Sequence, residues 1–229
     1  MGVTCENLVL GRGSFRLSAN WSLPSGASLA LIGPSGAGKS LFLGGLAGFE
    51  TVHEGRVLID GTDATGLAPS DRQLTLMFQD HNLFPHLTAF QNVALGVNPS
   101  LKLSDAESAR VERALAEVEL SGFSDRLPSQ LSGGQQSRVA LARALIRERA
   151  LLLLDEPFSA LGPGLRREML ALVEALRTGH QATLIFVTHS PQNAQKADFV
   201  SVVSDGVVGE PVEAEALFAD PPEVLRDYL

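Results

Sequence analysis

A glycine-rich loop near the N-terminus has the composition of a phosphate-binding site. Residues 33–40 read Gly-Pro-Ser-Gly-Ala-Gly-Lys-Ser and match the pattern G-x-x-x-x-G-K-[ST]. The glycines let successive backbone N–H groups turn towards phosphate oxygens, Lys39 adds a positive charge, and the hydroxyl of Ser40 is a ligand for Mg²⁺. We therefore predict that a nucleotide phosphate is held by Gly33, Pro34, Ser35, Gly36, Ala37, Gly38, Lys39 and Ser40.

Two adjacent carboxylates follow a run of four leucines further along the chain. Asp155 and Glu156 come directly after residues 151–154. A buried strand there would deliver both acids to the carboxyl edge of a parallel sheet, where such sheets bind ligands. We predict that Asp155 holds Mg²⁺ through a water molecule and that Glu156 orients or deprotonates the attacking water. Taken alone, the acid pair is equally compatible with the start of a loop.

A short polar motif precedes a helical pattern that carries several arginines. It consists of Ser132, Gly133, Gly134 and Gln135. Ser132 is suited to cap the helix, and the glycine amides are suited to bind a second anion. A capped helix without a ligand is the simpler interpretation of this motif by itself.

Two further polar residues follow apolar runs. Gln79 comes after the run at 74–78, where its amide could touch both Mg²⁺ and a water molecule. His189 comes shortly after the run at 182–187 and could donate a hydrogen bond to a γ-phosphate. A solvated glutamine and a structural histidine are the alternatives when each residue is considered alone.

Hydrophobic patterning predicts the elements that must position these groups. Short apolar runs bounded by turn residues indicate buried strands, and longer amphipathic stretches indicate helices. We expect strands at 28–32, 74–78, 151–154 and 182–187, and helices at 39–47, 104–118, 134–149 and 164–178. The alternation of strands with helices indicates an α/β fold built on a parallel sheet.

One long stretch differs from the rest of the chain. Residues 86–149 show helical patterns and no convincing strand, which indicates a helical subdomain inserted into the α/β core. Within it, Ser104 and Glu107 have the spacing of a capping box. After it, Gly179 is predicted to end the helix at 164–178.

Composition and charge exclude several classes of protein. The 229 residues are 45% hydrophobic and 19% charged, which fits a folded globular chain and not a disordered one. The net charge of −8 provides no overall positive field for nucleic acid. Cys5 is the sole cysteine in the sequence, which excludes an internal disulfide and indicates a reducing compartment. We expect neither a secretory leader nor an apolar run of the ~20 residues needed to span a bilayer.

Taken in order, these motifs resemble the nucleotide-binding subunit of ATP-binding cassette (ABC) transporters over nearly the whole chain. The order is the phosphate loop, Gln79, the motif at 132–135, the acid pair and His189. Asp155 lies 20 residues after Gln135 and 34 residues before His189, and both spacings are close to those of the family. The combination is more specific than any one of its members.

The resemblance implies a fold and a division of the chain. The fold is that of a P-loop NTPase of the ABC ATPase type, in which a mostly parallel sheet carries N-terminal antiparallel strands and an inserted helical subdomain. Within a single domain, residues 1–85 and 150–229 would form the RecA-like core with its β subdomain, and residues 86–149 the helical subdomain. Two copies of the chain would sandwich two ATP molecules, each held by the phosphate loop of one copy and residues 132–135 of the other.

The resemblance also implies partners and a location. A transmembrane permease would dock in a groove near Gln79, a solute-binding protein would act indirectly, and no nucleic acid would bind. The chain would then work at the cytoplasmic face of the cell membrane. Residues 80–88 and Asn92 look like the importer branch, and residues 94–103 are similar to the ATP-binding subunit of bacterial thiamine importers. Importers of iron(III), spermidine or sulfate remain alternatives, because the permease and the binding protein select the solute.

Two positions depart from the family pattern. Gly162 stands where the family usually has Asp, which removes a carboxylate expected to bridge the two sites and puts the coupling between them in question. The aromatic residue that stacks on adenine precedes the phosphate loop in the family. Phe15 is our assignment for it, and Trp21 is a weaker choice.

Two other function classes share parts of this pattern. A soluble ABC protein that acts on DNA would carry a long coiled coil between the phosphate loop and Leu131, and a translation factor would carry two cassettes. This chain has one cassette, and Leu131 comes 91 positions after Ser40. A small-molecule kinase would leave residues 132–135 and His189 without a role. An ATPase that drives an importer is therefore the leading hypothesis.

Overall fold

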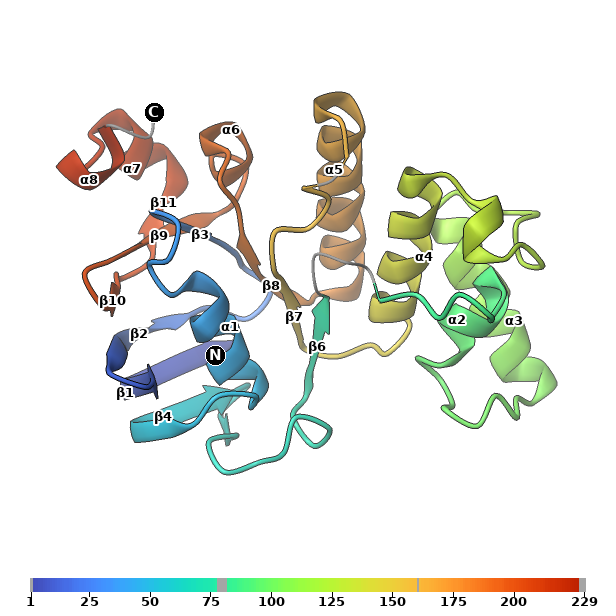
Figure 1. Cartoon of the computed structure of the whole chain (residues 1–229), viewed down its shortest axis with the longest axis horizontal. Helices are drawn as coiled ribbons and strands as arrows, with labels where there is room; N and C mark the ends of the chain where they lie inside the picture. The colour runs from blue at the N-terminus through green and yellow to red at the C-terminus, as the bar shows by residue number, and fades with distance from the viewer. Residues whose placement is uncertain (1, 78–81, 160, 227–229) are drawn as a thin grey trace. The chain divides into compact units, whose positions relative to one another are not determined.

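The computed structural model describes residues 2–77, 82–159 and 161–226. The chain divides into two compact units. The first unit comprises residues 1–76, 150–157 and 181–229, and the second comprises residues 77–149 and 158–180. Figure 1 labels the strands and helices of both units.

The first unit is an α/β core built on one β-sheet, which combines parallel and antiparallel strands. The strand order is β5-β4-β1-β2-β10-β9-β3-β8-β7-β6, with β11 paired to β9. The strands are β1 (Val3–Arg12), β2 (Phe15–Leu23), β3 (Ser28–Ile32), β4 (Val52–Ile59), β5 (Thr62–Asp63), β6 (Leu74–Met77), β7 (Leu151–Leu154), β8 (Thr183–Val187), β9 (Phe199–Ser204), β10 (Val207–Val208) and β11 (Val212–Glu213). The helices of this unit are α1 (Lys39–Ala47), α6 (Pro191–Ala194), α7 (Ala214–Ala219) and α8 (Glu223–Arg226).

The centre of the sheet is parallel and its N-terminal part is antiparallel. β3 pairs in parallel with β8 and β9, and β8 pairs in parallel with β7. β1 pairs in antiparallel fashion with β2 and β4. Every residue of β3, β7 and β8 is buried, as expected for parallel strands covered on both faces. The predicted α/β fold with N-terminal antiparallel strands is confirmed.

Most predicted elements of the first unit have the expected bounds. The strands at 28–32 and 151–154 and the helix at 39–47 are confirmed, and β8 begins one residue later than predicted. β6 spans residues 74–77, and the last residue of the predicted strand lies outside the described part of the chain.

The second unit is helical. Its elements are α2 (Ala89–Ala94), α3 (Asp105–Glu117), a short 3₁₀ helix η1 (Pro128–Gln130), α4 (Gly133–Leu145) and α5 (Pro163–His180). α2, α3 and α4 contact one another, and α5 contacts α4. Residues 86–149 are all described and contain no strand, as the sequence indicated. The predicted capping box of Ser104 and Glu107 is present at the start of α3.

Two predicted helix ends are wrong. The helix predicted to reach residue 149 ends at Leu145. Glu148 has a left-handed backbone (φ 49°), which an α-helix cannot contain, and β7 begins shortly after it. Gly179 does not end α5, which continues to His180. The left-handed residue that follows this helix is Gln181 (φ 53°). A glycine near a helix end is therefore an uncertain stop signal here.

A buried amide organises the loop that precedes α2. The side chain of Asn92 is fully buried. Its oxygen accepts a hydrogen bond from the N–H of Phe84 (2.8 Å), and its nitrogen donates to the carbonyls of Phe84, Leu87 and Thr88 at 3.0–3.1 Å. These bonds fix the loop at 84–88 against its own helix.

The thiol of the single cysteine belongs to the core of the first unit. Cys5 is buried in β1, and its burial raises the pKa of the thiol to about 12. The thiol is thus neutral over the whole physiological range. Across the described residues, no helix has the length and apolar character required to cross a bilayer.

The helix that carries Lys39 packs closely on β1 at one glycine. A Cβ atom at Gly45 would lie 2.3 Å from Cδ1 of Leu10, which is fully buried. At the neighbouring Gly44, a Cβ would lie 3.0 Å from Cγ of Glu50, a flexible side chain that can move.

We expect Gly45→Ala to destabilise the protein by about 1–3 kcal/mol, because the added methyl overpacks the core. The matched variant Gly44→Ala should be neutral or slightly stabilising, since alanine favours a helix. Urea unfolding followed by circular dichroism measures both. Equal stability of the two variants would contradict the tight contact with Leu10.

Candidate active site

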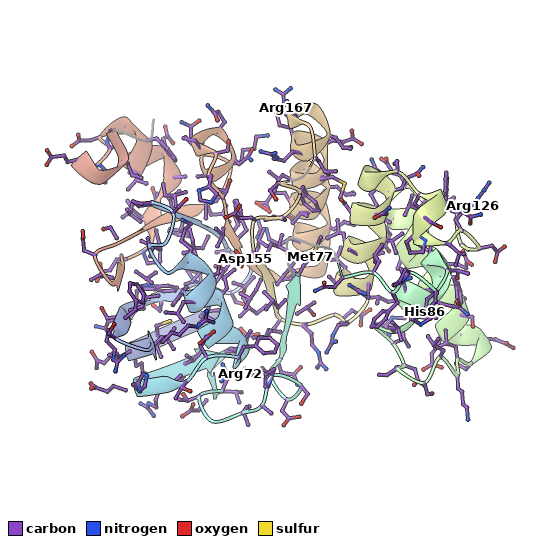
Figure 2. The ribbon with its side chains drawn as sticks, in the orientation of Figure 1. Arg72, Met77, His86, Arg126, Asp155 and Arg167 are labelled. Carbon is purple, nitrogen blue, oxygen red and sulfur yellow. The ribbon has the colours of Figure 1, made fainter. Side chains whose placement is uncertain are left out.

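Three adjacent strands of the first unit end at the same edge of the sheet. β3, β8 and β7 are neighbours and run parallel. Gly33 follows β3, Asp155 follows β7, and His189 comes two residues after β8. Figure 2 labels Asp155 where β7 ends. The topology therefore gathers chemical groups from three distant parts of the sequence, as parallel sheets do at their ligand sites.

The phosphate loop needs glycine where it passes closest to the sheet. Gly33 has a φ of 149°, and a Cβ there would lie 2.1 Å from the carbonyl oxygen of Val203 in β9. Gly38 has a φ of 103° and is the N-terminal cap of α1, with no side-chain hydrogen bond to the cap. The first N–H groups of α1 have no partner within the helix and form a typical anion site.

The ammonium of Lys39 holds the loop together from inside. Its Nζ donates to the carbonyls of Gly33 and Pro34, both at 2.8 Å, and the residue is only 6% exposed. Burial lowers the pKa of Lys39, while the charges of Glu156 and Asp155 act in the opposite direction. Two of the three N–H donors of the ammonium thus serve the loop, beside the place where a phosphate would bind.

A hydroxyl and a carboxylate meet next to Lys39. Oγ of Ser40 donates to Oδ1 of Asp155 at 3.2 Å. The pKa of Asp155 is raised, first by burial and further by the charge of Glu156, against the opposing effects of Ser40, Lys39 and His189. Hydroxyl and carboxylate oxygens are the hard donors that Mg²⁺ takes.

The second acid is paired with the histidine. Nε2 of His189 lies 2.6 Å from Oε1 of Glu156. Glu156 has a φ of 46°, a left-handed conformation that is uncommon outside glycine and that concentrates at functional sites. A carboxylate beside an imidazole is an arrangement that can orient a water molecule and accept its proton.

An exposed aromatic ring lies beside the phosphate loop. Phe15 begins β2 and is 39% exposed, and its Cε1 atom lies 3.1 Å from the Cβ position of Gly38. Trp21 belongs to the core instead: it is buried, its ring centroid is 5.6 Å from that of Phe42, and its N–H donates to the carbonyl of Val208. Of the two aromatic residues, Phe15 has the exposure that stacking on a base requires.

The motif at 132–135 begins α4 in the second unit. Oγ of Ser132 accepts the N–H of Gln135 (3.3 Å), and Oε1 of Gln135 accepts the N–H of Ser132 (2.9 Å). The predicted cap is therefore confirmed as a full capping box. Gly133 and Gly134 form the first turn, whose N–H groups are available to an anion in any helix.

One predicted residue of the site is not described by the structure. Gln79 and the groove expected near it lie outside the described residues.

The structure does describe Gly162, where the family usually has Asp. Gly162 is exposed at the start of α5, where its carbonyl accepts the N–H of Arg166, and a Cβ there would meet no atom within 4 Å. An aspartate would therefore fit at position 162, and its absence is not imposed by packing.

Comparison with known proteins identifies the family. A family model described as ABC transporter matches residues 17–159. The chain is 49% identical over 225 residues to the thiamine import ATP-binding protein ThiQ of Cereibacter sphaeroides, with 98% of this chain and 97% of that protein covered. It is 50% identical over 226 residues to the protein of the same name from Jannaschia sp. (strain CCS1), with 98% of both chains covered. This chain belongs to the ABC transporter family.

A solved structure agrees with this membership. The ABC ATPase is similar to the ATP-binding cassette MJ0796, whose dimeric structure was determined in a post-hydrolysis state with ADP and Pi. The TM-score is 0.77 at 29% identity, and the match covers 93% of this chain and 98% of the other. The chain is thus an ATPase whose hydrolysis drives transport, and the kinase alternative is excluded.

A buried arginine of this ABC ATPase has a role that the sequence motifs do not predict. Arg72 is 2% exposed. Its guanidinium donates to the carbonyls of Gly45 and Leu46 at the end of α1, and to those of Thr65 and Leu67 in the following loop, at 2.6–3.1 Å. It restrains the far end of the helix that begins at Lys39. The sequence shows only a charged residue shortly before an apolar run. That pattern is too common to predict a buried arginine.

Because burial raises the pKa of Asp155, its ionised form opposes folding when no ligand is bound. We expect Asp155→Asn to raise the thermal midpoint of the nucleotide-free protein by a few degrees at pH 7.5. Below the raised folded-state pKa the native carboxyl is neutral, so this difference should shrink as the pH falls towards the unfolded-state value of about 3.9. Scanning calorimetry at several pH values measures it.

The matched control is Asp71→Asn, which changes an exposed carboxylate and should leave the midpoint nearly unchanged at each pH. A lower midpoint for Asp155→Asn at pH 7.5 would show that the attraction of Lys39 and the hydrogen bond from Ser40 outweigh the cost of burial.

Proposed function

We propose that this chain is the ATP-hydrolysing subunit of a bacterial importer for thiamine. The observation that carries the proposal is the similarity to relatives named thiamine import ATP-binding proteins, at 48–50% identity over nearly the full length of both chains. Importers of iron(III), spermidine or sulfate are the alternatives within the same activity.

The phosphate loop is proposed to bind the β- and γ-phosphates of ATP. The N–H groups of Ser35, Gly36 and Gly38 and those at the start of α1 would face the phosphate oxygens, and the remaining donor of Lys39 would complete the contact. Pro34 has no N–H, and the N–H of Ala37 donates to the carbonyl of Pro34. Phe15 would stack on the adenine, since its exposed ring lies beside Gly38.

Ser40 and Asp155 are proposed to hold Mg²⁺. Their oxygens are 3.2 Å apart, and both are the hard oxygen donors that Mg²⁺ takes, either directly or through its bound water molecules. Ser40 would be a direct ligand, Asp155 would act through water, and Gln79 would complete the set. When bound, Mg²⁺ supplies positive charge that offsets the charge of the phosphate oxygens.

Glu156 and His189 are proposed to activate the attacking water. Glu156 would accept the proton of that water, and Gln79 would help to orient it. His189 holds the carboxylate of Glu156 through the 2.6 Å contact and would donate to the γ-phosphate when ATP is bound. The two residues would therefore act as one unit.

A second copy of the chain is the proposed partner for catalysis. The related cassette MJ0796 is dimeric in its ADP-bound state. In such a dimer, Ser132, Gly133, Gly134 and Gln135 of one copy would contact the ATP held by the other, through the N-terminus of α4. A permease would bind near Gln79 and keep the dimer at the cytoplasmic face of the membrane, and a solute-binding protein would deliver the substrate.

Uptake measurements test whether thiamine is the transported solute. In a strain that cannot synthesise thiamine, deletion of the gene should abolish uptake of labelled thiamine. The wild-type gene should restore it, and the Lys39→Ala gene should not, because the variant lacks the buried cation at the phosphates and should bind ATP more than tenfold more weakly. Normal thiamine uptake after deletion would refute the substrate and leave the ATPase assignment intact.

The dimer is tested with Glu156→Gln, which should stop hydrolysis and preserve ATP affinity, so that the closed dimer accumulates. Light scattering should show a shift from monomer to dimer mass on addition of Mg²⁺ and ATP. Each chain carries a charge of −8, so moderate salt should assist association by screening the repulsion.

Addition of Ser132→Arg to this variant is the control and should abolish the shift without affecting ATP binding. A monomer at high protein concentration, with ATP demonstrably bound, would contradict the two-chain site.

A further inference from the structure

The loop that carries His189 begins with a buried threonine. Thr188 comes directly after β8 and is 8% exposed. Its backbone N–H donates to the carbonyl of Leu31 in β3 (3.2 Å), which extends the parallel pairing of β8 with β3 by one hydrogen bond. All three residues belong to the first unit. The backbone in front of His189 is therefore attached to the strand that leads into the phosphate loop.

The side chain of Thr188 restrains the backbone on the other side of His189. Its Oγ1 accepts a hydrogen bond from the N–H of Ser190 (3.1 Å). A hydroxyl that accepts an N–H two residues ahead closes a short turn, which offers the backbone a local bond where the pairing of a strand ends. His189 is the residue that this turn encloses.

The turn leads directly into α6. The carbonyl of Ser190 accepts the N–H groups of Asn193 and Ala194, both at 3.1 Å, and Ala194 is fully buried. Ser190 is thus held by Thr188 on one side and by the first turn of α6 on the other. The backbone path through His189 is defined at both ends, and Nε2 of His189 reaches Oε1 of Glu156 at 2.6 Å within the same unit.

We propose that Thr188 is a positioning residue for ATP hydrolysis. Its hydroxyl closes the turn around His189 and so sets the direction from which the imidazole reaches Glu156 and the γ-phosphate. The inference rests on the roles proposed above for His189 and Glu156. It predicts that loss of the hydroxyl slows hydrolysis with little effect on nucleotide binding, because the backbone bond to Leu31 and the phosphate loop are retained.

The test compares three variants in the assembled transporter. Thr188→Val removes the hydroxyl and nearly keeps the shape of the side chain, whereas Thr188→Ser keeps the hydroxyl. Thr65→Val is the matched control, because Oγ1 of Thr65 also accepts a backbone N–H, that of Val57 (2.9 Å), and no group of the proposed site depends on it.

We expect Thr188→Val to lower kcat about tenfold, since a misplaced catalytic group costs rate more than affinity. KM for ATP and the directly measured Kd should change less than about threefold. Thr188→Ser should retain at least about half of the wild-type kcat, and Thr65→Val should match the wild type. In Thr188→Val, the amide of Ser190 should exchange its hydrogen faster, while the amides of β3 stay unchanged.

Three results would overturn the proposal. They are an unchanged kcat in folded Thr188→Val, an equal loss of kcat in Thr65→Val, and a Thr188→Ser variant as slow as Thr188→Val. His189→Ala is assayed alongside the other variants. If it hydrolyses ATP at the wild-type rate, the proposed role of His189 fails. If it is inactive while Thr188→Val is normal, only the present inference fails.

Discussion

The parallel alignment of β3, β8 and β7 is the constraint on which the rest of the site depends. Each strand is fully buried, so its register is fixed by packing on both faces, and each delivers its next residues to the same edge. Lys39, Asp155 and His189 are far apart in the sequence and meet only because of this alignment. A change that shifted one of these strands would break the hydrogen bond from Ser40 to Asp155 or the contact of His189 with Glu156.

Two buried charged groups at this edge of the sheet, Lys39 and Asp155, lower the stability of the nucleotide-free protein. Burial lowers the pKa of Lys39 and raises that of Asp155, so the ionised form of each is disfavoured by the same desolvation. The left-handed backbone at Glu156 adds local strain. A bound phosphate would pair with the charge of Lys39 and a bound Mg²⁺ with that of Asp155, which would offset the desolvation of both groups. The site is therefore suited to binding ATP more than to stabilising the empty protein, as is common where stability and activity compete.

Arginines act as internal restraints in both units. In the first unit, Arg72 binds four carbonyls around the end of α1. In the second, Arg138 donates to the carbonyl of Val118 and pairs with the carboxylates of Glu119 and Glu168, so it fixes α4 rather than offering its charge to an anion. Such planar, multidentate contacts hold backbone in place more firmly than a single ammonium does.

The sequence by itself determined the motifs, the parallel core and the order of the helical segments, because glycine spacing, strand hydrophobicity and capping residues are local signals. The capping boxes at Ser104 and Ser132 and the helix at 39–47 needed no tertiary information. Only the tertiary structure decided that His189 pairs with Glu156, that Trp21 is buried while Phe15 is exposed, and that α5 continues past Gly179. These outcomes depend on which distant residues pack together. A local pattern cannot distinguish a buried guanidinium from a solvated one, since burial is set by the neighbours that the fold brings to it.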